Sequence, residues 1–409
     1  MCFKETDILL PKKAHDPDFM KKWAVIACDQ HTCDISYWRK ARELAEGEMT
    51  ALNIIFPEAY LETESELEQQ KRMENIAECM VRYEKDMECH RDSMFYIERT
   101  LKNGSVRRGL VGAVDLEAYD YSQDSKAKIR PTEKTVPERI PPRLKIRRNA
   151  ILESPHAMIL FEDEGNILMS ELERGAPALE TIYDFELMQG SGAIKCRKLD
   201  RENMDYVKQT LKSLEKNGVL FAVGDGNHSL AAAKQCWEEI KKTLSPERHP
   251  AHPARYALAE IVNIHDSSLE FEPIYRILFE VEPFDVIESL KGFYGDLDSQ
   301  GHGLEIYCGG HFEKISVSHP QFSLPVESLQ VFLDEYVGRR GGKIDYIHGR
   351  AETLELAKGE NTVGFVFDTM KKSELFSAIA KNGVLPRKAF SMGEACDKRF
   401  YIECRRIRC

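Results

Sequence analysis

The residues best suited to chemistry lie in one short segment, residues 221–229, which read FAVGDGNHS. Asp225 and His228 bring a carboxylate and an imidazole to the same few residues. A carboxylate is a ligand that Mg²⁺ accepts together with phosphate oxygens. An imidazole can donate to a phosphate oxygen or relay a proton. The segment therefore favours phosphate chemistry.

The elements around this segment must position those side chains. The apolar run Val219–Val223 predicts a buried strand, and Gly224 and Gly226 break it. Asn227 then stands where a helix cap is expected, and apolar residues recur at helical spacing through Ile240. A strand, a glycine turn and a helix together aim unpaired backbone N–H groups and the positive end of the helix dipole at one point, which favours an anion. The alternative is a tight turn in which Asp225 and Asn227 serve only as caps.

The turn and four other stretches resemble an uncharacterised conserved family, domain of unknown function (DUF) family 1015. The turn carries the resemblance through GDGNH at residues 224–228. The other stretches are Arg108–Glu117 with Tyr119 and Tyr121, Ile129–Thr135 with Arg139 and Arg143, Asn263–Pro273 with Arg276, and Leu385–Ser391. Together they span nearly the whole chain.

The turn is also similar to the strand–turn–helix sites of ParB-like and sulfiredoxin-like folds and of free-serine kinases. This resemblance implies an ATP or ADP site with Mg²⁺ and a small-molecule acceptor. Two positions depart from the pattern. Asn227 replaces the cysteine that sulfiredoxins need, and Ser229 replaces the usual arginine, so a guanidinium that grips phosphate is missing from the turn.

The resemblance and the residue types lead to a specific set of candidate site residues. The candidates for catalysis are Asp225, which is also the candidate metal ligand, His228, and Glu133 as a base that accepts a hydroxyl proton. The candidates for nucleotide binding are Gly224, Gly226, Asn227, Ser229, Arg139 and Arg143. For Glu133, a surface ion pair is an equally good explanation.

Composition excludes several classes of function. The chain has 409 residues, of which 42% are hydrophobic and 31% charged, which is typical of a globular protein. The net charge of −11 argues against a general nucleic-acid surface. No apolar run approaches the ~20 residues that a membrane span needs. Eleven scattered cysteines and no signal-peptide pattern at the first residues predict a cytoplasmic protein with reduced thiols.

The alternation of elements predicts a mixed α/β (α+β) fold, with several mixed sheets, flanking helices and a ParB/sulfiredoxin-like strand–turn–helix site. We expect an N-terminal region over residues 1–270 that carries the site and a C-terminal α/β region over residues 271–409. Strands are predicted over residues 23–28 and 52–56, among others, and a hairpin around Asn103-Gly104. Residues 118–150 lack clear periodicity, which favours a long functional or mobile segment.

Three functions fit this set of features. The first is an ATP- or ADP-dependent kinase that phosphorylates a small hydroxyl compound such as an amino acid. The second is a nucleotide-binding regulator without catalysis. The third is a metal-dependent phosphohydrolase that uses Asp225 and His228.

Overall fold

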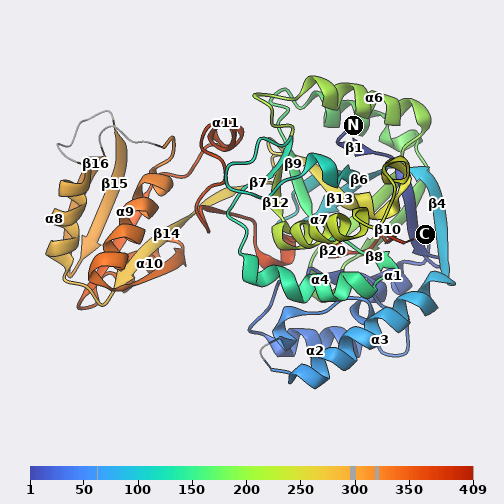
Figure 1. Ribbon diagram of the computed structural model, residues 1–409, viewed down its shortest axis with the longest axis horizontal. Helices are drawn as coiled ribbons and strands as arrows, with labels where there is room; N and C mark the ends of the chain where they lie inside the picture. The colour runs from blue at the N-terminus through green and yellow to red at the C-terminus, as the bar shows by residue number, and fades with distance from the viewer. Residues whose placement is uncertain (62, 295–300, 318–321, 409) are drawn as a thin grey trace. The chain divides into compact units, whose positions relative to one another are not determined.

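The computed structural model describes residues 1–61, 63–294, 301–317 and 322–408 (Figure 1). The chain falls into two compact units. The first comprises Met1–Pro131, Thr135–Leu269 and Glu394–Cys409, and the second comprises Thr132–Lys134 and Glu270–Gly393. Both units combine helices and sheets, which confirms the mixed α/β prediction. The division of the chain at residues 270/271 stays a prediction.

The first unit is built on a nine-stranded mixed sheet. Its strands, in spatial order, are β10 (Thr181–Glu186), β11 (Ala193–Lys198), β5 (Phe95–Thr100), β6 (Val106–Asp115), β13 (Tyr256–Asn263), β9 (Met158–Phe161), β12 (Phe221–Asp225) and β7 (Ile129–Pro131), with β1 (Phe3–Lys4) beside β6. Most neighbours are antiparallel, but β13 pairs with β9 and β12 pairs with β7 in parallel.

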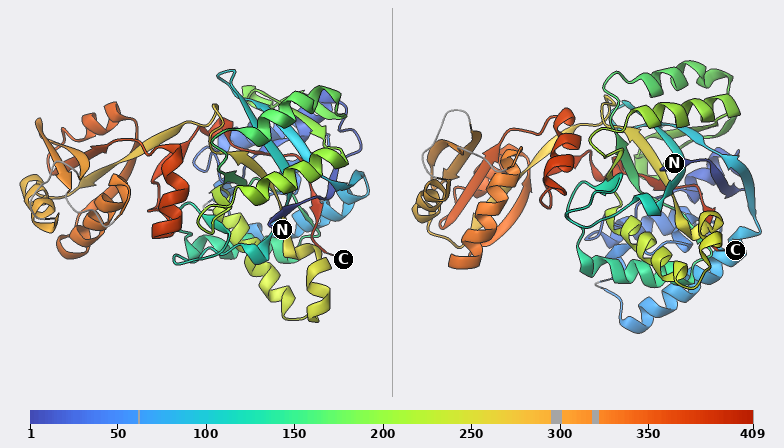
Figure 2. Two further views of the ribbon diagram at one scale, coloured as in Figure 1. Left: turned by 90° about the horizontal axis from the view of Figure 1, so that it is seen from above. Right: turned by 45° about the horizontal axis from the view of Figure 1, so that its top comes forward.

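Helices and short ribbons complete the first unit (Figure 2). The helices are α1 (Pro17–Trp23), α2 (Ile35–Leu44), α3 (Glu66–Glu84), α4 (Ile140–Asn149), α5 (Ile167–Gly175), α6 (Arg201–Ser213) and α7 (Asn227–Lys241). The two-stranded ribbons are β2 (Thr6–Pro11) with β4 (Met87–Ser93), β3 (Val25–Ile26) with β20 (Phe400–Tyr401), and β8 (Leu152–Glu153) with β21 (Arg405–Arg406). Short 3₁₀ turns include Ala51–Asn53, Glu58–Tyr60 and Pro137–Arg139.

The sheet has a hydrophobic core on each face, because successive side chains of a strand point to opposite sides. In β5, Phe95 and Ile97 belong to one core, whereas Tyr96 belongs to the other. The first core also contains Trp23 and Trp38, and the second contains Trp237 of α7. Burial on both faces explains why the central strands are nearly continuous apolar runs rather than alternating ones.

The second unit is built on a six-stranded sheet. Its strands are β16 (His311–Val317), β15 (His302–Cys308), β18 (Thr362–Phe367), β14 (Phe271–Phe279) and β17 (Lys343–His348), with β19 (Phe390–Met392) paired to β14. Its helices are α8 (Pro283–Tyr294), α9 (Pro325–Arg340), α10 (Arg350–Leu356) and α11 (Lys372–Asn382). No helix in the described ranges of the chain is long and apolar enough to cross a membrane.

Several expected elements are wrong. Residues 52–56 form the end of a 3₁₀ turn and irregular chain rather than a strand, and the strand expected over residues 23–28 is limited to Val25–Ile26. Residues 118–150, expected to lack elements of their own, contain β7 and the helix α4. Pro141 and Pro142 obscured this helix, but they occupy its first turn, where proline is tolerated because that N–H needs no partner.

Candidate functional site

The turn after β12 is shaped by its two glycines. The pairing of β12 with β9 shifts register between Val223 and Asp225, so Gly224 lies at a bulge. Gly226 has a φ of +80° and packs against Ala157, the residue directly before β9, since a Cβ at position 226 would lie 2.8 Å from the Cα of Ala157. Both the left-handed conformation and the close approach require glycine at position 226. The turn is therefore fixed against the sheet.

The predicted strand–turn–helix is present, and α7 begins without a side-chain cap. Gly226, not Asn227, is the cap residue, so the prediction that Asn227 caps the helix is wrong. The first helical hydrogen bond joins the Leu230 N–H to the Gly226 carbonyl at 3.0 Å. The three residues before Leu230 are Asn227, His228 and Ser229. Their N–H groups have no carbonyl acceptor within the helix. Together with the helix dipole they form a positively polarised point.

One carboxamide oxygen and one carboxylate oxygen at the turn are buried and lack a hydrogen-bond donor. Asn227 Oδ1 and Asp225 Oδ2 accept no hydrogen bond from any residue in the described ranges. Asp225 Oδ1 accepts the Gly226 N–H at 2.9 Å, and the Lys398 ammonium lies 3.6 Å from Oδ2. Buried oxygens of this kind usually have a partner, so both fit a donor or a cation supplied by a ligand.

Asp225 fits Mg²⁺ only as a single protein ligand. In the described part of the chain, no three His, Cys, Asp or Glu side chains are grouped to hold a metal ion. Mg²⁺ is commonly held by one or two carboxylates together with phosphate oxygens and water. The orphaned Oδ2 is suited to that arrangement, in which the ion would compete with Lys398 for the same oxygen.

His228 is held as a neutral imidazole with a fixed tautomer. Its Nε2 accepts the backbone N–H of Val136 at 3.1 Å, so the proton resides on Nδ1. Burial, together with the guanidinium groups of Arg143 and Arg139, lowers the pKa of His228 to about 4. At neutral pH this side chain is therefore a hydrogen-bond donor through Nδ1, not a cation.

Arg139 and Arg143 lie at the start of α4, which packs along α7 (Figure 1). Ile140 and Leu144 of α4 form an apolar cluster with Ala231 and Ala232 of α7, which fixes the spacing of the two helices. Arg143 forms an ion pair with Glu58 and donates to the Arg139 carbonyl.

Of the two arginines, only Arg143 lines the cavity. It faces the same cavity as the first turn of α7, whereas Arg139 is exposed and is not part of the cavity wall. The charge of Arg143 is already partly neutralised by Glu58.

A cavity of about 210 Å³ adjoins the turn within the first unit. Ser229 and Leu230 of α7 form part of its wall. Most of the remaining wall is apolar and comes from α3, α4 and the segment before α3, including Ile54, Ile55, Phe56, Leu61, Met73 and Ile146. This volume is smaller than the roughly 300–1,000 Å³ of sites that enclose a whole drug-sized ligand. It therefore suits one part of a ligand, or one small compound.

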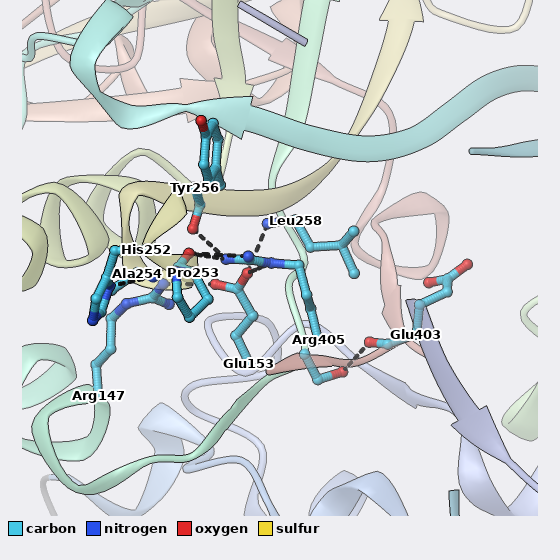
Figure 3. A network of polar contacts seen from close by, with 10 residues as sticks. Arg147, Glu153, His252, Pro253, Ala254, Tyr256, Leu258, Glu403 and Arg405 are labelled. Atoms are coloured by element: carbon cyan, nitrogen blue, oxygen red, sulfur yellow. Dashed lines mark hydrogen bonds and ion pairs between the residues drawn. The ribbon is translucent and has the colours of Figure 1, made fainter. Parts of the chain in front are cut away.

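A buried ionic network supports the wall of this cavity (Figure 3). The Glu153 carboxylate lies 2.7 Å from Arg405 and 2.7 Å from Arg147, and it accepts the Leu258 N–H at 2.8 Å. Burial alone would raise the pKa of Glu153, but the two guanidinium groups hold it below its usual range. The network ties β8, α4, β13 and the C-terminal strand β21 together, so it fixes the position of the cavity wall.

Four polar residues that sequence reasoning did not join meet beside the cavity: Cys28, Asp29, His156 and Tyr401. The Tyr401 hydroxyl lies 2.7 Å from His156 Nδ1 and donates to Cys28 Sγ at 3.0 Å. Asp29 Oδ2 lies 3.6 Å from His156 Nε2. His156 and Tyr401 are 245 positions apart, so no spacing in the sequence could have joined them. Only the location of Asp29, directly after a predicted strand, was a signal.

Glu133 belongs to a different compact unit from the turn after β12. It belongs to the second unit, where its carboxylate accepts the Ala389 N–H at 3.3 Å and its backbone pairs with Leu385. It is not among the residues that line the cavity of the first unit. Its role as a base stays a prediction.

Comparison with known proteins places the chain in a family. Residues 9–336 match the family described as "Protein of unknown function (DUF1015)". The chain belongs to this family. The resemblance to this family is thus confirmed, and the matched residues include the turn and three of the four other stretches; Leu385–Ser391 lies outside them. No curated protein matches this DUF1015 chain.

The chain is also similar to several solved structures at low identity. A free serine kinase mutant in complex with ADP is 11% identical, with 74% of this chain and 93% of that chain covered and a TM-score of 0.40. A conserved hypothetical protein from Pyrococcus furiosus is 11% identical, with coverage of 72% and 94% and a TM-score of 0.36. SbnI with a C-terminal truncation, from Staphylococcus aureus, is 10% identical, with coverage of 73% and 84% and a TM-score of 0.35.

Proposed function

We propose that the first unit binds ATP or ADP at the turn after β12 and transfers a phosphoryl group to a small hydroxyl compound. The observation that carries this proposal is the uncapped start of α7 beside a cavity. Three backbone N–H groups precede the first helical hydrogen bond, and Ser229 of this turn lines the cavity. Such a helix start binds phosphate without needing an arginine in the turn itself.

Four side chains support the same ligand. The Arg143 guanidinium in the cavity wall supplies the positive charge that Ser229 does not. The neutral His228 donates through Nδ1 to a phosphate oxygen. The buried Asn227 Oδ1 would accept from a ligand hydroxyl or amine, and Asp225 Oδ2 would hold Mg²⁺. Bound Mg²⁺ would neutralise charge on the transferred phosphoryl group. Positioning and charge neutralisation of this kind are what phosphoryl transfer requires.

The proposal is tested by calorimetric titration of the whole protein with ADP and with adenosine, each in Mg²⁺ buffer. We expect ADP to bind and adenosine to bind at least tenfold more weakly, because the phosphates carry the contacts to α7. Arg143→Met should weaken ADP binding about tenfold, which corresponds to about 1.4 kcal/mol. The matched control is Arg148→Met, which removes an exposed arginine of the same helix that pairs with Glu239.

Catalysis is then followed by ³¹P NMR with ATP or ADP and a panel of hydroxyl compounds. A new phosphate ester supports the kinase. Tight ADP binding without any product, with every acceptor tried, would instead identify a nucleotide-binding regulator. Equal affinity for adenosine and ADP would contradict the phosphate site at α7.

A further inference from the structure

The sequence singled out Arg276 and the segment Leu385–Ser391, and the proposed nucleotide site uses neither. Both belong to the second unit, where they meet. The Arg276 guanidinium donates to the backbone carbonyl of Arg387 at 3.2 Å and to that of Lys388 at 3.1 Å. Arg276 therefore holds this short loop against its own strand, β14.

Three cationic side chains gather at one aromatic ring there. Tyr346 of β17 lies directly opposite Arg276 of β14 in the sheet. The Arg276 Cζ atom lies 4.6 Å from the centre of the Tyr346 ring. Arg387 Cζ and Lys388 Nζ each lie 5.2 Å from the same centre. An aromatic ring attracts a cation within about 6 Å, but it has no net charge and cannot neutralise three cations.

Arg276 carries its charge without a carboxylate in contact. Its side chain is fully buried, and its remaining hydrogen bonds go to the Gln330 side-chain oxygen, at 2.9 Å, and to the Ile274 carbonyl. Both of these acceptors are neutral. Burial, with a further contribution from the charge of Arg387, lowers the pKa of Arg276 to about 10, so the group is still a cation at neutral pH.

The two exposed cations of the loop are not neutralised either. Arg387 and Lys388 form no ion pair with a carboxylate anywhere in the described ranges. Glu133 and Asp334 attract the charge of Arg276, but each carboxylate accepts a hydrogen bond from another group, a backbone N–H and a side-chain amide respectively. The cluster of Arg276, Arg387 and Lys388 thus has an excess of positive charge that an anion would neutralise.

The backbone of the loop brings its two side chains to the same place. Consecutive residues of a strand point to opposite sides, yet Arg387 and Lys388 both reach the Tyr346 ring. Lys388 has a φ of +55°, which residues other than glycine rarely adopt, and the hydrogen bond from Arg276 to its carbonyl supports this conformation. Strained residues of this kind are frequent at ligand clamps.

We propose that Arg387 and Lys388 bind a small anion with at least two negative charges beside Tyr346, and that Arg276 is a positioning residue. The ligand's phosphoryl or carboxylate oxygens accept from the exposed guanidinium and ammonium groups. Every residue of this site belongs to the second unit, so the proposal does not depend on the proposed nucleotide site.

Tyrosine ¹³C NMR of the whole protein tests the site, with the Tyr346 signal assigned by Tyr346→Phe. Inorganic phosphate, pyrophosphate, succinate and acetate are titrated separately at constant ionic strength. We expect a saturable shift of the Tyr346 signal with the first three anions. Acetate, with one charge, should bind at least about tenfold more weakly, because it cannot accept from both cations.

The anions also distinguish the two sources of such oxygens. Tighter binding of phosphate and pyrophosphate than of succinate assigns a phosphoryl ligand, and the reverse order assigns a dicarboxylate. A Tyr346 signal that does not respond to any of the three multiply charged anions would overturn the proposal. Equal affinity for acetate would overturn it as well.

Variants assign the binding to the loop. Arg387→Met and Lys388→Met should each weaken it about tenfold or more, since each removes one charge-assisted hydrogen bond. The matched control is Arg339→Met, which alters an exposed arginine of α9 that pairs with Glu335 and should leave the affinity unchanged. Native affinity in Arg387→Met and Lys388→Met would refute the assignment. A protein that fails to bind ADP but shows the Tyr346 shift would refute the proposed function and support this site.

Discussion

Replacing Gly226 by alanine tests whether the turn after β12 is a rigid phosphate cradle. Gly226 has a φ of +80°, and an alanine in that conformation costs about 1–2 kcal/mol. The new Cβ would also lie 2.8 Å from the Cα and 3.0 Å from the Cβ of Ala157, the residue directly before the interior strand β9. Overpacking of this kind costs about 1–3 kcal/mol. We therefore expect Gly226→Ala to lose about 2–5 kcal/mol of unfolding free energy.

The same clash should displace the start of α7. Loss of one charge-assisted hydrogen bond between an amide and a phosphate costs about 1.5–3 kcal/mol, which weakens ADP binding about 10- to 150-fold. Gly104→Ala is the matched control, because its φ is +85° but no atom lies within 4 Å of the new Cβ. The free energy of unfolding, from chemical denaturation, and the affinity for ADP, from calorimetry, are measured on both variants. Unchanged ADP affinity in a folded Gly226→Ala variant would refute the reasoning.

Three further predictions concern single side chains. The pKa of His228 is about 4 in the folded protein and 6.5 ordinarily, so on acidification the unfolded chain binds this proton before the folded protein does. The contribution of His228 to the free energy of unfolding is therefore complete above pH 6.5 and is lost as the pH falls towards 4. We expect His228→Gln to flatten the decline in denaturation midpoint between pH 7 and pH 5. Glu153→Gln leaves Arg405 and Arg147 without their carboxylate and should cost about 3–5 kcal/mol by urea denaturation, whereas the exposed Glu164→Gln should cost almost nothing. Asp225→Asn should abolish the increase in ADP affinity on adding Mg²⁺, measured by calorimetry, while Asp205→Asn on the surface of α6 should retain it.

Local patterns in the sequence predicted the strand–turn–helix well. Apolar residues of β12, the paired glycines and the helical period of α7 all act within about twenty residues, so they are visible without a fold. The hairpin of β5 and β6 around Asn103-Gly104 was found for the same reason. The cap of α7 was predicted as Asn227 but is Gly226. A glycine with positive φ needs no side chain to join the strand to the helix, so the sequence pattern did not single it out.

The rest of the site depends on contacts between distant segments. Arg143 was named from a motif, but its partner Glu58 belongs to a 3₁₀ turn, Glu58–Tyr60, that lies beyond the strand predicted over residues 52–56. Lys398 reaches Asp225 from the C-terminal segment, which returns to the first unit after the second unit is complete. The pairing of the short strands β3 and β20 brings Tyr401 near Asp29, and His156 comes from the segment between β8 and β9. Spacing within one sequence carries no information on such pairings.

A crystal structure of the whole protein with ADP bound tests the central claim most directly. The account predicts phosphate oxygens within about 2.7–3.2 Å of the backbone nitrogens of Asn227, His228 and Ser229. Phosphates placed away from the first turn of α7, with those three nitrogens unchanged from the free protein, would contradict it.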